Sequence, residues 1–264
     1  MSSSADDLAL ALELADVADA ITVSRFCADD LVVQSKPDLS PVSEADLAVE
    51  QALRERLAGA RPADAIFGEE YGGTDPARPV PRRWIVDPID GTMGYVRRMP
   101  VWATLLALEE DGELTVGVVS APALGRRWWA ATGAGAFVRM GAGAEPRRLR
   151  VSGVRELADA QLCFGGLEDW RAVGRLDALL ELGSRCWRTR GFGDFWQYML
   201  VAEGAAELAC DPSVSLWDLA APAVIVREAG GQFTALDGVA RAGGISGLAS
   251  NGLLHDAARG ILGG

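Results

Sequence analysis

Apolar residues recur at helical spacing in the first sixty positions, and this pattern predicts two helices. The apolar face of the first, expected over residues 5–29, carries Leu8, Leu12, Ala15 and Phe26. A turn-rich stretch, "SKPDLSPVSEAD", leads into the second helix, "SEADLAVEQALRERLAG". Ser43 is the candidate N-cap of this helix, and Gly59 is its stop signal.

Between residues 102 and 138 the apolar pattern changes to that of a strand meander. The stretch "WATLLALEEDGELTVGVVSAP" contains two β-rich runs joined by Asp111-Gly112, which is a strong hairpin signal. "RRWWAATGAGAFV" continues with further short strands. Earlier in the chain, "AIFGEEYGG" is typical of a short strand that runs into a loop.

Strands and helices alternate in the second half of the chain. We expect strands in "AQLCFGG", "CWRTRGFGD", "AELACDP" and, as the last one, "GQFTALDG". Helices are expected near residues 170–183 and 195–204 and in "WDLAAPAVIVREAGG", where Pro222 suits a first turn better than a helix centre. The whole is a mixed α/β chain of the layered type.

The stretch "GAGAEPRR", residues 141–148, is the best candidate for a boundary between subdomains. We therefore expect an N-terminal α+β subdomain over residues 1–145 and a C-terminal α/β subdomain over residues 146–264.

The composition is that of a soluble globular protein, since 49% of the 264 residues are hydrophobic and 23% are charged. No apolar run approaches the roughly 20 residues that a membrane span needs, and the acidic N-terminus lacks the basic start of a secretory signal. We therefore expect a cytoplasmic protein with no membrane partner. The net charge of −12, without a block of Lys and Arg, argues against nucleic acid as a partner.

The cysteine and histidine content narrows the chemistry. The four cysteines are scattered, and in a reducing compartment we expect them to be small buried hydrophobic side chains. His255 is the only histidine of the chain, which nearly rules out a zinc site or a histidine-dependent triad. Any catalytic metal must therefore be bound through oxygen.

The strongest candidate for chemistry is "WIVDPIDGTMGYVRR", residues 84–98. Its first three residues form a buried strand by composition, and Pro88 holds Asp87 in an extended backbone conformation. The Ile89 carbonyl oxygen can then turn inward while Asp90 comes round to the same side. Two carboxylates and a carbonyl oxygen are thus expected to converge.

The same stretch offers backbone amides. Gly91 allows a close backbone approach, and the amides of Gly91 and Thr92 open the next turn or helix, which is an anion site. The plainer alternative is a strand-ending turn whose aspartates only cap local amides. Two carboxylates at short range both stay ionised only if a cation bridges them, and hard oxygen ligands without histidine suit magnesium.

Further polar residues sharpen this hypothesis. Glu69 and Glu70 lie in "FGEEYGG", at a strand-to-loop transition, and Asp218 lies where the apolar helix of "SLWDLAAPAVIVREAGG" begins. Taken singly, they could be a solvated loop pair and an N-cap. Lys36 and Asp46 frame the turn-rich stretch "SKPDLSPVSEAD".

Together these segments resemble the inositol monophosphatase family of magnesium-dependent phosphatases. "GEE", "WIVDPIDGT" and "WDLAAPAVIVREAGG" occur in the order and at the spacing of that family, over essentially the whole chain. The chain looks most like the actinobacterial branch that acts on histidinol phosphate, through "KPDLSPVSEAD", "PVWATLLALEEDG", "VGVVSAPALGRRWWAA", "CWRTRGFGDF" and "SNGLLHD". The resemblance implies an α/β fold, a five-layered α-β-α-β-α sandwich, assembled as a homodimer.

The resemblance also implies a site with two or three Mg²⁺ ions. The implied metal ligands are Glu69, Asp87, the Ile89 carbonyl oxygen, Asp90 and Asp218. Asp87 would bridge two ions, Glu69 would serve the first, and Asp90 and Asp218 would serve the second. Two ions roughly 4 Å apart would offset the charge of a phosphate monoester and lower the pKa of a bound water.

Other roles follow from the same resemblance. Gly91 and Thr92 would offer amides to the phosphate, while Thr92 and Asp46 would orient the attacking water and help to deprotonate it. Lys36 would balance the charge of the acidic cluster from outside it. Most metal ligands would thus lie in the N-terminal subdomain, with Asp218 and the substrate pocket in the C-terminal one.

The candidate substrate pocket is less clearly marked. Asp211, Asp194 and Arg190 are candidates beside Asp218, although Asp194 and Arg190 could equally form a structural ion pair. Glu168 and Asp169 are expected on the surface.

The turn departs from the family pattern. Members commonly carry Asn two residues after the threonine, where this chain has Gly94, and Met93 stands where a polar residue is common. Met93 could be a packing residue or part of a substrate wall.

We therefore expect a Mg²⁺-dependent phosphomonoesterase that acts on the phosphate of a small polar alcohol. Histidinol phosphate, an intermediate of histidine biosynthesis, is the first choice on overall resemblance. Acidic residues in the pocket would suit its amino alcohol, and they would equally accept hydrogen bonds from sugar hydroxyl groups. A paralogue acting on a sugar or cyclitol phosphate is the second choice, and inositol monophosphate is the third. A catalytically silent magnesium-binding or regulatory protein is the alternative from another class.

Overall fold

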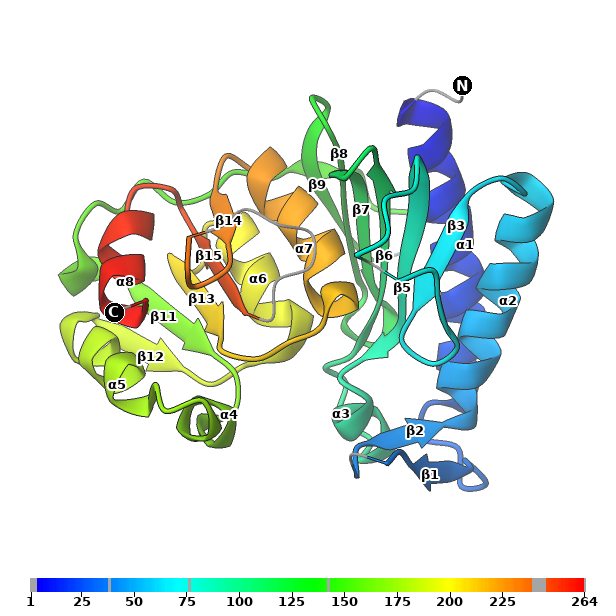
Figure 1. The fold of residues 1–264 in the computed structure, drawn as a ribbon, viewed down its shortest axis with the longest axis horizontal. Coiled ribbons are helices and arrows are strands. Elements are labelled where there is room, and N and C mark those ends of the chain that lie inside the picture. Colours follow the sequence, from blue (N-terminus) through cyan, green and yellow to red (C-terminus); the bar gives the residue numbers. More distant parts are fainter. Residues whose placement is uncertain (1–3, 38, 76, 142, 239–245, 264) are drawn as a thin grey trace.

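The computed structural model describes residues 4–263 apart from positions 38, 76, 142 and 239–245. The elements are stacked in five layers, and Figure 1 shows them from the N-terminal helices on the right to the C-terminal helices on the left. The order is helix pair, eight-stranded sheet, helix pair, five-stranded sheet, helix layer. The α-β-α-β-α sandwich predicted from the sequence is confirmed.

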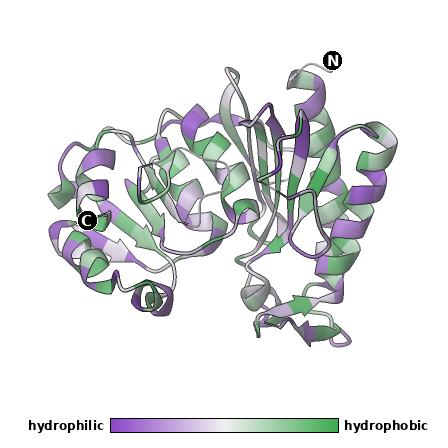
Figure 2. Cartoon of the chain, viewed as in Figure 1, coloured by the Kyte–Doolittle hydropathy of each residue, from purple (hydrophilic) through white to green (hydrophobic). Residues whose placement is uncertain are grey.

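The first layer consists of α1 (Ser4–Arg25) and α2 (Glu44–Ala60), which pack against one face of the larger sheet. Ser43 caps α2 as predicted, whereas the helix runs one residue past Gly59. Helix α1 ends four residues before the predicted position 29, and Cys27 follows with a left-handed φ of 65°. Figure 2 shows both helices banded green and purple, because their apolar faces meet the sheet while their polar faces meet water.

The larger sheet has the strand order β10-β9-β8-β7-β6-β5-β3-β4 and is mostly antiparallel. Its strands are β3 (Ala65–Gly68), β4 (Gly72–Gly73), β5 (Arg82–Asp90), β6 (Ala103–Glu110), β7 (Glu113–Ala121), β8 (Arg126–Ala131), β9 (Gly135–Met140) and β10 (Arg147–Arg148). The predicted hairpin is confirmed: Asp111 and Gly112 join β6 to β7 with φ of 51° and 86°.

The middle layer consists of α6 (Asp194–Ala202) and α7 (Leu216–Glu228), which lie between the two sheets. The prediction that Pro222 lies in a first turn is wrong, because Pro222 is inside α7. Proline there removes the amide hydrogen that would bond the carbonyl oxygen of Asp218. The helix persists because it is buried along most of its length within the largest apolar cluster of the described chain.

The smaller sheet has the order β12-β11-β13-β15-β14. Its strands are β11 (Gln161–Phe164), β12 (Arg188–Arg190), β13 (Leu208–Asp211), β14 (Gln232–Thr234) and β15 (Gly247–Ser250). The last layer, on its outer face, consists of α4 (Leu167–Ala172), α5 (Leu176–Arg185) and α8 (His255–Leu262). The sequence prediction of one helix over 170–183 is wrong, because a turn at Gly174, with φ of 72°, separates α4 from α5.

Two predictions about strands also need correction. The last strand is β15 rather than the segment around "GQFTALDG", and the stretch predicted to be only a turn contains the hairpin of β1 (Val33–Ser35) and β2 (Pro41–Ser43). The chain passes from the larger to the smaller sheet between residues 148 and 161. Strand β10 still pairs with β9 in the larger sheet, and β11, which begins at Gln161, belongs to the smaller one. The boundary after residue 145 stays a prediction.

Three apolar clusters hold the layers together: one between α1, α2 and the larger sheet, one around α6 and α7, and one between the smaller sheet and its outer helices. Cys163 and Cys210 belong to these clusters, as predicted, but Cys27 is exposed, so the prediction of burial is wrong for it. Within the described ranges, no helix is long and apolar enough to cross a membrane.

Candidate active site

Strand β5 carries two aspartates, Asp87 and Asp90, at an irregularity in its pairing with β6. The register shifts between these two residues, because Asp87 is opposite Leu105 whereas Asp90 is opposite Ala103. The Thr104 hydroxyl donates a hydrogen bond to the Pro88 carbonyl oxygen at 2.8 Å and fixes the bulge from the neighbouring strand. The bulge is what lets both carboxylates reach the same side of the strand.

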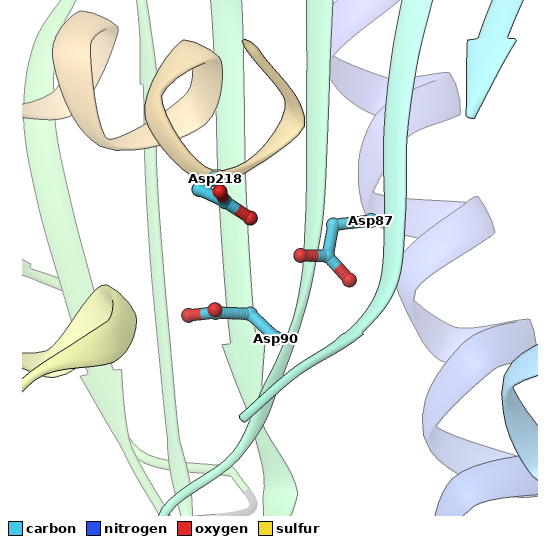
Figure 3. Close-up of side chains that lie close together, drawn as sticks. All are labelled: Asp87, Asp90 and Asp218. Atoms are coloured by element: carbon cyan, nitrogen blue, oxygen red, sulfur yellow. The ribbon is translucent and has the colours of Figure 1, made fainter. Parts of the chain in front are cut away.

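Asp218 completes a cluster of three carboxylates from the other side. It is the third residue of α7, and one oxygen each from Asp87, Asp90 and Asp218 lies within 4.8 Å of the others. Figure 3 shows the three groups pointing into one space, from β5 and from the first turn of α7. The convergence predicted for Asp87 and Asp90 is therefore present, and a third ligand joins it from the second half of the chain.

Burial and mutual repulsion disfavour ionisation of this cluster. Burial raises the pKa of Asp87 well above its usual range, and the charges of Glu69, Asp90 and Asp218 raise it further. The pKa of Asp90 is raised by burial and by Asp194 and Asp218, and burial raises that of Asp218 to about 7. A bound divalent cation would offset the negative charges and so lower these pKa values again.

One buried oxygen atom of the cluster could bind such a cation. The buried Oδ1 atom of Asp87 has no hydrogen-bond partner within the described part of the chain. Only oxygen ligands converge here, and His255, the single histidine, is buried elsewhere between β14, β15 and α8. The donor set therefore fits a hard cation such as Mg²⁺.

Helix caps aim two of the site's aspartates. Asp46 and Asp218 each occupy the third position of a helix that begins after a serine, in "SEAD" and "SLWD". In both, the serine amide donates to Oδ2, at 2.8 Å in α2 and 2.7 Å in α7. Each cap thus fixes the carboxylate and leaves the second oxygen for the site.

The free oxygen of Asp46 faces Thr92. The distance from Thr92 Oγ1 to Asp46 Oδ1 is 3.0 Å, and Thr92 Oγ1 is 2.8 Å from the Ile89 carbonyl oxygen. Burial raises the pKa of Asp46, although hydrogen bonds from Ser43 oppose this shift. The structure thus brings together the pair that the sequence predicted as a water-orienting unit.

Glu69 lies next to Asp87 because β3 and β5 run in parallel. Its amide donates to the Val86 carbonyl oxygen at 3.2 Å, one step beyond the last paired residues of the two strands. Lys36 contacts Glu69 and Glu70, with its Nζ atom 2.7 Å from a carboxylate oxygen of each. Burial raises the pKa of Glu70 to about 7, although its hydrogen bond from Lys36 opposes the shift.

A pocket of about 440 Å³ opens beside the cluster, between β11, α6 and α7. The carboxylates that line it are Asp90, Asp169, Asp194, Asp211 and Asp218, and no described lysine or arginine lines it. Burial raises the pKa of Asp211 to about 7 and that of Asp194 to about 6. The pocket is therefore acidic well beyond the three-carboxylate cluster.

Sequence reasoning placed some pocket residues better than others. Asp211 and Asp194 line the pocket, whereas Arg190 lies outside it, is exposed and donates to the carbonyl oxygen of its neighbour Thr189. Asp169 is exposed, as expected, but it lies on the pocket wall. The signal that could have revealed Asp169 is the Gly-Gly pair that precedes α4, since a Cβ at Gly166 would lie 2.9 Å from its carboxylate.

The turn after β5 is built on two glycines. Gly91 has a φ of 87° and caps the five-residue helix α3 (Thr92–Val96), and a Cβ on it would lie 3.0 Å from the Val101 carbonyl oxygen. A Cβ at Gly94 would lie 3.1 Å from the same oxygen. Met93 is 54% exposed, so it is not a packing residue, and it is absent from the pocket lining.

This fold and site define a class of protein. The model of the inositol monophosphatase family matches residues 5–261, and the chain belongs to this family. It is 55% identical over 251 residues to the histidinol-phosphatase of Mycobacterium tuberculosis, with 95% of each chain covered. It is 54% identical over 265 residues to the histidinol-phosphatase of Streptomyces coelicolor, with 97% of each covered.

Among solved structures, an inositol monophosphatase from Zymomonas mobilis superposes with a TM-score of 0.85 at 28% identity, covering all of both chains. An IMPase of Thermotoga maritima has the same TM-score at 29% identity, with 98% of this chain and 97% of that chain covered. The predicted family and branch are confirmed by these comparisons.

Proposed function

We propose that this protein is a magnesium-dependent phosphomonoesterase that hydrolyses histidinol phosphate. One observation carries the proposal: the carboxylates of Asp87, Asp90 and Asp218, from β5 and α7, converge, and Asp90 and Asp218 line a pocket whose other charged side chains are also carboxylates. The cluster suits a divalent metal with an anionic phosphate, and the pocket wall suits a cationic leaving group.

The proposed metal ligands are Glu69, Asp87, the Ile89 carbonyl oxygen, Asp90 and Asp218. Bound Mg²⁺, two or three ions by family resemblance, would supply charge to offset the phosphate and to lower the pKa of a water molecule. The protein aims these ligands in advance, since the amide of Phe195 holds one oxygen of Asp90 at 2.5 Å and the amide of Ser215 holds one of Asp218. The second oxygen of each is left for a cation.

Thr92 and Asp46 are the proposed proton acceptors for water. The Thr92 hydroxyl can accept a hydrogen from water while it donates its own to Asp46, whose pKa is raised by burial. The amides of Gly91 and Thr92 are the proposed contacts to phosphate, because Gly91 has no side chain to cap α3 itself. Lys36 is proposed to keep Glu69 in place through its ion pair.

The pocket wall supports an amino alcohol as the leaving group. The carboxylates of Asp169, Asp194 and Asp211 lie beyond the cluster and would stabilise the ammonium group of histidinol. Two relatives with more than half of their residues identical to this chain are named histidinol-phosphatases. Family resemblance further supports a homodimer in the cytoplasm, which light scattering of the purified protein and fractionation would test.

A second candidate is a sugar or cyclitol phosphate. The pocket carboxylates could also accept hydrogen bonds from sugar hydroxyl groups, and the solved relatives named above are inositol monophosphatases. A substrate panel separates the two: kcat/KM for histidinol phosphate should exceed that for inositol 1-phosphate and glucose 6-phosphate about 10- to 100-fold, as expected from a desolvated ammonium–carboxylate contact. Equal rates on all three would overturn the histidinol assignment.

A further inference from the structure

One face of α2 carries three polar residues, Asp46, Glu50 and Arg54, spaced four residues apart. We call them the α2 polar row. Residues at this spacing lie above one another, about one helical turn apart. Asp46 and Glu50 are fully buried, and the Arg54 side chain is 26% exposed. Sequence reasoning assigned a role to Asp46 alone, so the other two need an explanation.

Glu50 binds the loop that follows β3. Its Oε2 atom accepts the amide of Glu70 at 2.7 Å, and its Oε1 atom accepts the amide of Tyr71 at 3.2 Å. These amides directly follow Glu69. The buried Glu50 carboxylate therefore holds the backbone that carries this proposed metal ligand.

Arg54 closes the same loop from the next turn. It donates from Nε to Glu50 Oε1 at 2.8 Å and from Nη2 to the carbonyl oxygen of Gly72, and its guanidinium lies over the Tyr71 ring, 5.9 Å from the centroid. The charge of Glu50 is thus paired as well as hydrogen-bonded, which a buried carboxylate requires.

The strand is shaped to admit Glu50. A Cβ at Gly68 would lie 2.1 Å from Glu50 Oε1, closer than side-chain atoms can approach. Glycine at the end of β3 therefore leaves the space in which the carboxylate reaches the loop. The contact between Glu50 and the loop therefore depends on both the α2 polar row and the glycine at the end of β3.

The first member of the row binds a different segment. Asp46 accepts a hydrogen bond from Thr92, which follows the bulge that carries Asp87 and Asp90. One helix face thus contacts both segments that adjoin the proposed metal ligands of the larger sheet: the turn after β5 through Asp46 and the loop after β3 through Glu50.

We propose that Glu50 is a positioning residue that fixes Glu69 relative to Asp87, and so sets the affinity of the site for metal without contacting it. This inference rests on the proposed function, because it takes Glu69 and Asp87 as metal ligands. Removing such an outer contact typically lowers metal affinity 10- to 100-fold.

The test is a double-mutant cycle of Glu50→Gln with Glu69→Gln. Each protein is first stripped of metal and then titrated with MgCl₂, and the rise of its thermal unfolding midpoint gives the apparent Mg²⁺ affinity. Glu50→Gln should weaken the apparent Mg²⁺ affinity about 10-fold. In the Glu69→Gln background the same change should weaken it less than about 3-fold, because coupled residues are not additive. Gln51→Ala, an exposed position on the same helix, is the matched control and should leave the affinity unchanged.

Two results would overturn the inference: an unchanged Mg²⁺ affinity in a Glu50→Gln protein that is merely less stable, or an equal loss in both backgrounds. If Glu50→Gln does not fold, Arg54→Gln replaces it in the cycle, with the same pattern expected at smaller amplitude. Activity measured against Mg²⁺ concentration adds a second readout. The kcat of Glu50→Gln at saturating Mg²⁺ should return toward the wild-type value. Absence of any Mg²⁺ response in wild-type protein would instead overturn the proposed function, and this inference with it.

Discussion

The hydroxyl group of Thr92 lies 3.0 Å from Asp46 Oδ1, across the gap between the turn after β5 and the first turn of α2. The hydroxyl has one hydrogen and two acceptors, because the Ile89 carbonyl oxygen is 2.8 Å away. When the hydrogen goes to Asp46, the hydroxyl oxygen is free to accept a hydrogen from water. The pair can then act as a proton relay.

Thr92→Val keeps the shape of the side chain and removes the relay. We expect kcat to fall by about 10²- to 10⁴-fold, the usual contribution of a positioned acid–base group, with the fold intact. Thr92→Ser keeps the hydroxyl and is the matched control. Steady-state phosphate release by the three proteins checks this, and full activity of Thr92→Val would refute the relay.

The carboxylate cluster should make apoprotein and metal-bound protein respond in opposite ways to Asp87→Asn. Without metal the variant should be more stable than wild type, because one of several repelling buried carboxylates is neutralised. With Mg²⁺ at about 100 times its dissociation constant, wild type should gain about 2.7 kcal/mol and the variant much less. Thermal unfolding in EDTA and in MgCl₂ measures both, and equal Mg²⁺ stabilisation would contradict the metal assignment.

His255 should make the protein sensitive to acid. Its buried ring lies between Thr234 and Ser250, at 3.0 and 2.9 Å, and burial lowers its pKa to about 4, while Asp256 and Arg259 on α8 have smaller, opposite effects. The pKa in the unfolded chain is about 6.5, so the unfolded state binds the extra proton first as pH falls. This contribution is present above pH 6.5 and is lost between pH 6.5 and about 4.

At pH 5 the loss is about 2 kcal/mol of unfolding free energy relative to pH 7. Urea unfolding at both pH values measures this loss in wild type and in His255→Gln, whose glutamine side chain cannot be protonated in this pH range. The variant should lose about 2 kcal/mol less than wild type between the two pH values. The same loss in both proteins would show that other groups govern the acid response.

Asp211 should matter for the choice of leaving group. It accepts hydrogen bonds from Tyr198 and Gln197, which fix its carboxylate in the pocket. Asp211→Asn should lower kcat/KM for histidinol phosphate about 10- to 100-fold, by loss of a charge-assisted contact, and change it far less for a neutral sugar phosphate. Arg190→Ala, outside the pocket, is the comparison. An equal loss on both substrates would point to a general effect on the site.

The chemistry of the site was predictable where it is local. Asp87, Asp90 and their turn form a short sequence motif, and Asp46 and Asp218 each follow a serine by three residues, so local rules identify them. The apolar patterns indicated a layered α/β chain, whereas the number and order of the five layers followed from the family resemblance alone.

Elements that depend on tertiary contacts were not predictable in the same way. Strand β15 is four small or apolar residues that pair only because β13 and β14 flank it. Pro222 lies mid-helix because burial between two sheets outweighs a missing hydrogen bond. Glu50 lies near the site through the contact of α2 with the loop after β3, which no local pattern encodes. Asp169 reaches the pocket wall through the placement of α4, for which the preceding Gly-Gly pair is the one local signal.

Phosphate release from histidinol phosphate by metal-stripped protein, before and after Mg²⁺ is restored, tests the central claim most directly. The account predicts negligible release without metal, full activity on restoring Mg²⁺, and no recovery in Asp87→Asn. Equal release with and without Mg²⁺, or full activity of Asp87→Asn, would contradict it.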